Sequence, residues 1–531
     1  MRTLVRAFLP TAADYRGGSW RNDVVAGITV AVVALPLALA FGITAGLGAQ
    51  AGLVTAIVAG LVAAVFGGSH VQVSGPTGAM TVVLVPLVAR QGTDAVLTVG
   101  VVAGVLVVAA GLLRLGRLVG FIPWPVVEGF TVGIAVIIFL QQVPAALGVP
   151  KPEGENTALV AWRAVATNDA LAGAVAVTVL VAAIMVVGPR IRRTLPVSLI
   201  GVVVATLVAE ALDLDIARIG ALPSSLPSPA LPDLGPSRVS ELLGPALVVA
   251  ALAALESLLS AKVADGMADR PRHDPNRELF GQGLANVVSP LFGGMPATGA
   301  IARTAVNVRA GAQTRLSAIV HAVVLLVVVM VGGDLVARIP LAALAGVLMV
   351  TAVRMVDVHN VRAVLRSTRS DALVMVVTTA ATVAFDLIVA VEIGLAVAAV
   401  LALRQVARTS TITREPVAVE VGGEDEVRLL HDHIVTYRLD GSLFFGAAQR
   451  FLGELVSVGD VRVVILRLPN LQILDATGAQ ALGEIVEELE HRHVTVLLKG
   501  PRAPHRRTLE AVGVFRRLAH EKHVFDDLDA A

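Results

Sequence analysis

Two runs of small and polar residues interrupt hydrophobic sequence: Val71-Gln72-Val73-Ser74-Gly75-Pro76-Thr77-Gly78 and Gly293-Gly294-Met295-Pro296-Ala297-Thr298-Gly299. The first lies within residues 24–89, a stretch that contains no Asp, Glu, Lys or Arg. Both runs place Gly, Pro and hydroxyl residues just before a short segment that can form a helix. In transporters built from two inverted repeats, broken helices occur at matching places in the two halves. An ordinary turn between two spans would explain one such run, but two in matching places favour a transporter.

The sequence around these runs predicts an α-helical polytopic membrane protein. Of its 531 residues, 56% are hydrophobic and 16% are charged, whereas soluble chains are about 25% charged. A membrane span needs roughly 20 apolar residues. We predict about 14 spans in two series of seven, and an odd number in each series inverts the second repeat. The expected spans are three within 24–89, then 95–113, 118–143, 170–188 and 195–212, and 242–261, 279–293, 295–310, 315–332, 339–353, 371–386 and 388–403.

Loop charges predict how the chain is oriented. Arginines gather in alternate loops, and the N-terminal segment belongs to the same side. By the positive-inside rule this side is the cytosol. We therefore expect a multi-pass protein of the cell (inner) membrane with both termini cytosolic. The expected domains are a cytosolic segment (1–23), a transport domain (24–408, with repeats at about 24–212 and 242–408) and a C-terminal domain (425–531).

The interruptions suit an anion. A helix that begins inside the membrane has unpaired N–H groups and a partial positive charge at its N-terminus. Two such ends that face each other can bind one anion. The candidate substrate-binding residues supply hydroxyl donors, glycines that allow close approach to the backbone, and one cation: Ser74, Gly75, Thr77, Thr298, Gly299 and Arg303.

Glu256 lies within the first span of the second half. A carboxylate at that depth costs a few kcal/mol unless it is protonated or paired. We therefore interpret Glu256 as the proton-coupling residue, beside an anion-attracting Arg303. The alternatives are a structural ion pair, or an Arg303 that extends to the cytosol. His70 and His321 are further candidates to relay protons, although a lone histidine is more often a hydrogen-bonded interior group.

The C-terminal region has a different character. Strand-like alternation at 427–439 and 461–468 and at 494–498 is separated by helix-compatible segments at 447–456 and 475–491. This order predicts a small α/β domain. Thr477, in Asp475-Ala476-Thr477-Gly478, suits a plain helix N-cap in which Asp475 or Thr477 accepts backbone N–H bonds.

Other functions find little support. The chain has no cysteine, which removes thiolate chemistry and most structural zinc sites. Its net charge of +1 provides no basic field for nucleic acid. Because no nucleophile triad, nucleotide loop or metal cluster stands out, we expect no enzymatic activity, no catalytic residues, no metal and no cofactor.

Several segments together resemble the SulP (sulfate permease) family of anion transporters: Ala26-Gly27-Ile28-Thr29-Val30, Ser74-Gly75-Pro76-Thr77, Gly120-Phe121-Ile122-Pro123, Glu256-Ser257-Leu258-Leu259, Asn276-Arg277-Glu278-Leu279 and Gly299-Ala300-Ile301-Ala302-Arg303-Thr304-Ala305-Val306-Asn307. The resemblance implies fourteen spans in two inverted repeats, a core domain that moves against a gate domain, and a homodimer. It places the substrate between the third and tenth spans. The C-terminal region resembles the STAS domain, which implies that Thr477 can be phosphorylated and that a cytosolic protein can bind this domain.

Two departures from the family pattern narrow the function. Sulfate-type members carry glutamine after the first-span proline, where this chain has Leu37. Sodium-coupled bicarbonate relatives offer a hydroxyl near Ala300, which has none, so we favour protons over sodium. The segment from Glu256 to Asn307 is most similar to bacterial dicarboxylate carriers. The leading hypothesis is a proton-coupled symporter of a dicarboxylate or an inorganic anion. The alternatives are a sodium-coupled bicarbonate importer, and a channel-like or sensory protein that signals through its STAS domain.

Overall fold

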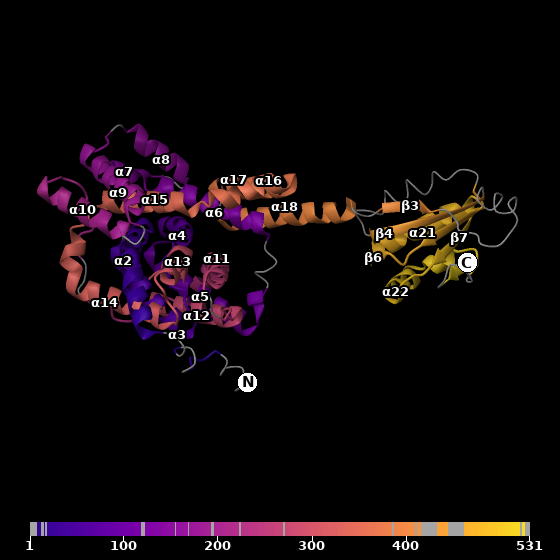
Figure 1. Cartoon of the computed structure of the whole chain (residues 1–531), viewed down its shortest axis with the longest axis horizontal. Coiled ribbons are helices and arrows are strands. Elements are labelled where there is room, and N and C mark those ends of the chain that lie inside the picture. Colours follow the sequence, from indigo (N-terminus) through magenta and orange to yellow (C-terminus); the bar gives the residue numbers. More distant parts are fainter. Residues whose placement is uncertain are drawn as a thin grey trace. The chain divides into compact units, whose positions relative to one another are not determined.

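A computed structural model describes residues 8–11, 15, 19–117, 123–153, 156–167, 169–192, 196–221, 225–268, 271–384, 387–408, 411–415, 433–443, 461–520 and 523–525. The chain divides into two compact units, Met1–Leu395 and Ala396–Ala531. The first is almost wholly helical and the second contains a sheet, as Figure 1 shows. The predicted helical transport domain and small α/β domain are therefore both present.

The helices of the first half follow the predicted spans closely, because long apolar runs dictate where helices form. The long helices of this half are α2 (Trp20–Thr44), α3 (Gly48–Phe66), α4 (Gly78–Gln91), α5 (Thr93–Leu112), α6 (Trp124–Gln141), α9 (Ala172–Ile191) and α10 (Val197–Ala211). The connection between α6 and α9 contains two short helices that the hydrophobic pattern did not predict, α7 (Val143–Leu147) and α8 (Thr157–Ala166).

A second series follows the proline-containing loop. It comprises α11 (Pro236–Met267), α12 (Pro275–Leu291), α13 (Ile301–Arg309), α14 (Leu316–Ala337), α15 (Leu341–Met355), α17 (Arg369–Ala384) and α18 (Leu387–Arg408). The additional helix α16 (Val358–Ser367) was predicted as a loop. It is a short, arginine-containing helix, and Asp357 caps its N-terminus by accepting hydrogen bonds from two backbone amides. Among the described residues, eight helices are long and apolar enough to cross a membrane, judged by length and composition.

Helix packing relates the two series as inverted repeats. Helix α5, the fourth of the first series, packs on α11 and α12, the first two helices of the second series. Helix α14, the fourth of the second series, packs in the same way on α2 and α3, the first two helices of the first series. Likewise α17 packs on α6 as α15 packs on α9. Helices α2–α5 and α11–α14 form one bundle, while α6, α9, α10, α15 and α17 form another (Figure 1). This confirms the predicted membrane fold of two inverted seven-span repeats.

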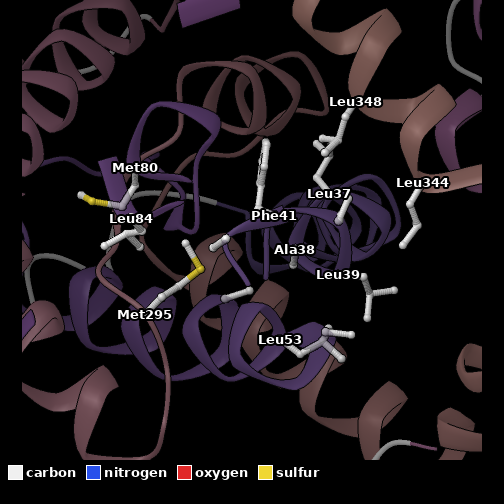
Figure 2. Close-up of a cluster of buried hydrophobic side chains, with 14 of the residues drawn as sticks. Leu37, Ala38, Leu39, Phe41, Leu53, Met80, Leu84, Met295, Leu344 and Leu348 are labelled. Atoms are coloured by element: carbon white, nitrogen blue, oxygen red, sulfur yellow. The ribbon is translucent and has the colours of Figure 1, made fainter. Parts of the chain in front are cut away.

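The interior of the transport domain is packed closely around α2 and α3. An added Cβ on Gly52 of α3 would lie 1.9 Å from the carbonyl oxygen of Ala38 in α2, so only glycine permits this approach. Figure 2 shows part of the surrounding apolar cluster, which includes Leu37 of α2, Met80 of α4 and Leu344 of α15. This packing holds α4 beside α2, and so fixes the start of α4.

The second unit contains a mostly parallel sheet. Its strands are β3 (Thr411–Glu415), β4 (Ile434–Leu443), β5 (Val463–Arg467), β6 (Leu471–Leu474), β7 (Thr495–Lys499) and β8 (Val524–Phe525). They are ordered β3-β4-β5-β7-β8, β6 also pairs with β4, and only β3 is antiparallel to its neighbour. Helices α21 (Ala476–His491) and α22 (Ala503–Val512) complete the unit.

The strand and helix predictions at 461–468, 475–491 and 494–498 are confirmed by β5, α21 and β7. The strand predicted from residue 427 is observed from Ile434, since residues 416–432 lie outside the described residues. The helix predicted at 447–456 also lies outside them. The domain has its own core, which includes Leu439, Leu466, Leu482 and Leu498.

Candidate functional site

Two short strands bring the interruptions together. Strand β1 (Ser74–Gly75) pairs antiparallel with β2 (Thr298–Gly299), with Ser74 opposite Gly299 and Gly75 opposite Thr298. The amide of Ala300 continues this pairing by donating to the carbonyl of Val73 at 2.9 Å. Antiparallel pairing of equivalent segments is what inverted repeats produce. The sequence placed both runs correctly but could not show that they pair.

Each strand leads directly into a half-helix. Helix α4 begins at Gly78 and is capped by Thr77, whose Oγ1 accepts a hydrogen bond from the amide of Met80 at 3.3 Å. Helix α13 begins at Ile301, and its N-cap residue, Ala300, makes no side-chain capping bond. The first amides of each helix have no acceptor within the helix, and their dipoles add positive potential. The two N-termini therefore present donors suited to an anion.

Glu256 of α11 joins the two half-helices. Its Oε2 accepts a hydrogen bond from Thr77 Oγ1 at 2.9 Å and another from Thr298 Oγ1 at 2.7 Å. One hydroxyl comes from each repeat. Glu256 is partly buried, whereas the two threonines are buried. The structure thus places the predicted proton-coupling carboxyl group in direct contact with two of the predicted substrate-binding residues.

Arg303 lies in the first turn of α13, which begins at Ile301 shortly after β2. Its side chain is 2% exposed, and one amino group donates to the carbonyl oxygen of Pro76. Arg303 therefore bridges the repeats instead of extending to the cytosol. Its other amino nitrogen, Nη1, is buried and has no hydrogen-bond partner within the described part of the chain. Arg303 and Glu256 influence each other electrostatically without a direct ion pair.

The glycines of the strand pair are required sterically. Gly75 has a φ of 155°, which side chains rarely adopt, and an added Cβ would lie 2.5 Å from Arg303 Nη1. An added Cβ on Gly299 would lie 1.8 Å from Nε2 of Gln72. Both positions allow polar groups to reach the backbone. The roles of the predicted substrate-binding residues remain predictions, but all six lie in one place.

Several polar neighbours support the strand pair. Ser257 Oγ accepts from the amide of Gly299 at 2.9 Å. Gln282 of α12 donates to Ser74 Oγ and to Glu278, and Glu278 accepts from the amide of Gly68 at 2.8 Å. The polar residues Glu278 and Gln282, four apart on a helix of small residues, were a signal that could have identified this network.

Thr477 lies in the C-terminal unit, at the start of α21. Asp475 caps α21 by accepting from the amide of Gly478 at 2.7 Å, so the cap belongs to Asp475. Thr477 is exposed in the first turn of this helix. Within the described residues, no group of three or more His, Cys, Asp or Glu side chains could hold a metal ion.

Comparison with known proteins identifies the family to which this fold and site belong. Residues 20–378 match the sulfate permease family, and residues 429–531 match the STAS domain. This chain belongs to the sulfate permease family. The putative sulfate transporter YvdB of Bacillus subtilis (strain 168) is 35% identical to it, over 97% of this chain and 98% of that protein. The bicarbonate transporter BicA of a Picosynechococcus species is 32% identical, over 94% and 92%.

Solved structures agree. The transmembrane domain of a cyanobacterial bicarbonate transporter BicA is 36% identical, has a TM-score of 0.65, and covers 70% of this chain and 97% of its own. Murine Slc26a9, an anion transporter in the inward-facing state, has a TM-score of 0.85 at 16% identity, over 100% of this chain and 94% of its own, and supports the fold alone. This sulfate permease family member is therefore a multi-pass anion transporter and not an enzyme, as predicted.

Proposed function

We propose that this protein is a proton-coupled symporter that carries a small anion across the cell (inner) membrane by alternating access. The anion binds between the N-termini of α4 and α13, and Glu256 carries the proton. The bundle of α2–α5 and α11–α14 moves against the bundle formed by α6, α9, α10, α15 and α17. Both termini are in the cytosol.

The observation that carries this proposal is that Thr77 and Thr298 donate to the same oxygen of Glu256. A hydroxyl has one proton to donate. An ionised Glu256 therefore takes the donors that an anion at the two half-helices would need, and it also repels that anion. A protonated Glu256 is a weaker acceptor, so an anion can compete for the two hydroxyls, and it also becomes a donor itself. Anion and proton then bind together, which is the requirement for symport.

The N-cap of α13 favours a proton over sodium. Sodium is a hard cation that prefers several oxygen ligands, as calcium and magnesium do. Ala300 supplies no side-chain oxygen at the position that matches Thr77. A sodium ion beside Glu256 would have the two threonine hydroxyls as neighbours but no third hydroxyl from the N-cap of α13.

The substrate belongs to the dicarboxylates or to the sulfate and bicarbonate class of inorganic anions. Relatives named as sulfate and bicarbonate transporters support the second group. The resemblance of the segment from Glu256 to Asn307 to bacterial dicarboxylate carriers supports a dicarboxylate. Either kind of anion can accept hydrogen bonds from the amides and hydroxyls at the two helix N-termini.

The STAS domain has a regulatory role in this proposal. It binds a cytosolic protein or supports a homodimer, and phosphorylation of Thr477 alters that contact. Thr477 is exposed in the first turn of α21. The helix N-terminus would stabilise the negative charge of a phosphate on Thr477, whereas the nearby carboxylate of Asp475 would repel it.

Uptake into liposomes tests the function. Purified protein is offered labelled fumarate, succinate, bicarbonate or sulfate, with an inward proton gradient, an inward sodium gradient or neither. We expect one of these anions to accumulate on the proton gradient alone. Accumulation of bicarbonate only with sodium would identify a sodium-coupled importer, and uptake that never exceeds equilibrium would identify a channel-like protein.

A further inference from the structure

A group of buried polar atoms behind the strand pair has no hydrogen-bond partner. Within the described residues, the unpartnered atoms include both ring nitrogens of His321, Nη1 of Arg303 and Oδ1 of Asn307. His321 is fully buried, and Asn307 is equally buried. Buried polar groups are almost always satisfied, by protein or by ordered water. Several unpartnered atoms in one region are best explained by internal water molecules.

Helices α13 and α14 are joined by a hydrogen bond between Asn307 and Ser317. Nδ2 of Asn307 donates to Ser317 Oγ at 2.9 Å, which joins the two helices near their connection. Residues four apart share one face of a helix. Arg303 lies four residues before Asn307 on α13, and His321 lies four residues after Ser317 on α14. The charge of Arg303 acts on His321.

A polar route continues from Asn307 and Ser317 to the buried carboxylate of Asp23. Ser317 Oγ donates to the carbonyl of Thr314 at 3.0 Å, and Thr314 Oγ1 donates to the carboxylate of Asp23 at 2.6 Å. Asp23 lies in the first turn of α2, at the end of the helix where the chain enters the transport domain. On the other side, the charge of Arg303 acts on Glu256, so polar residues extend from the site towards the end of the transport domain that holds Asp23.

Few other charged groups face His321. Helix α14 packs on α2 and α3. Helix α3 contains no titratable residue, and α2 contains only Arg21 and Asp23, in its first turn. On α14 itself the other titratable group is Asp334, thirteen residues along the helix. Within the described residues, Arg303 is therefore the charged group that acts on His321.

We propose that His321 relays the coupled proton between Glu256 and the connection of α13 with α14, through water molecules that bridge Arg303, His321 and Asn307. This inference rests on the proposed proton symport. Glu256 gives its proton, through water, to one nitrogen of the neutral imidazole. The other ring nitrogen gives its proton to a water that donates a hydrogen bond to Asn307 Oδ1. That water passes a proton on, through further water, towards the connection of α13 with α14, and the imidazole ends neutral in the other tautomer. No proton is gained or lost in the transfer.

The test compares net uptake driven by a proton gradient with counterflow at equal pH on both sides. His321→Gln keeps a polar side chain but cannot exchange one proton for another. We expect it to slow net uptake on the order of a hundredfold, the usual scale for a lost proton-transfer group, while counterflow and anion affinity are retained. Ser317→Ala, which removes one link of the route, should slow net uptake less. His359→Gln, on the exposed side of α16, is the matched histidine control.

The possible outcomes separate this inference from the proposed function. If His321→Gln concentrates the anion as the unmodified protein does, the relay is wrong and symport stands. If His321→Gln loses counterflow together with net uptake while remaining folded in detergent, His321 serves binding or structure and the relay is again wrong. If the unmodified protein fails to respond to a proton gradient, the proposed function itself fails. Should His321→Gln not fold, an unchanged rate in Ser317→Ala would overturn the relay.

Discussion

Replacing Thr298 with valine removes one hydroxyl from the site and changes the shape of the side chain very little. Thr298 Oγ1 lies 2.7 Å from Glu256 Oε2 and is fully buried, so no bulk water can take its place. When Glu256 is protonated, this hydroxyl is free to donate to the anion. A hydrogen bond to a charged group contributes about 1.5–3 kcal/mol. Thr298→Val should therefore weaken anion binding roughly 10- to 150-fold.

The assay is equilibrium binding of the labelled substrate to detergent-solubilised protein at a pH where the unmodified protein binds well. Thr206→Val is the matched control, because Thr206 Oγ1 donates to the carbonyl of Val202 within its own helix, α10, at 2.8 Å. The control should bind as the unmodified protein does. The double variant Thr77→Val/Thr298→Val should lose less than the sum of the single losses, since both hydroxyls contact one oxygen. An unchanged dissociation constant in Thr298→Val would place the anion elsewhere.

Three further predictions concern the frame around this site. Arg303→Ala should weaken substrate binding by roughly 2 kcal/mol while the solubilised protein stays folded; unchanged affinity would assign Arg303 to scaffolding. Gly299→Ala should lower the free energy of unfolding by about 1–3 kcal/mol through overpacking, which is measured as a lower Tm. Gly332→Ala is the control and should leave the Tm unchanged, because its Cβ would meet Val328 at 3.7 Å, an ordinary contact. Equal Tm values for the two variants would contradict the close approach at Gly299. Residues from about 425 should fold alone, with a cooperative unfolding transition, because they have their own apolar core. A carrier truncated at about residue 425 should lose assembly or regulation but keep its substrate. Altered substrate selectivity in that carrier would argue against the site at β1 and β2.

The sequence predicted the helices well because a membrane span depends on local hydrophobicity. The expected spans and the observed helices agree to within a few residues for α5, α9 and α10. Helices α7, α8 and α16 were not predicted, since they are short and their stability comes from packing and capping. The start of α13 was predicted too early, because Thr298 and Gly299 are held extended by a partner strand more than 200 residues away.

The site was predicted only in part, because some of its features are local in the sequence and others are long-range contacts. Helix breaks, buried charge and hydroxyl groups are visible in a sequence, and they identified Thr77, Glu256 and Thr298. Long-range partners are not visible. Nothing local to Arg303 indicates that its side chain reaches Pro76, and nothing local to Glu256 indicates that two hydroxyls share one of its oxygens. These contacts follow from how the repeats pack.

The role of Glu256 in coupling is the central claim, and one comparison tests it most directly. Glu256→Gln has the shape of the protonated acid but cannot release a proton. It is reconstituted beside the unmodified protein, and labelled substrate uptake is measured with an inward proton gradient and, separately, as counterflow at equal pH. We predict that Glu256→Gln retains anion binding and counterflow but no longer accumulates substrate on the gradient. If Glu256→Gln concentrates the anion as the unmodified protein does, another group carries the proton and the account of coupling is wrong.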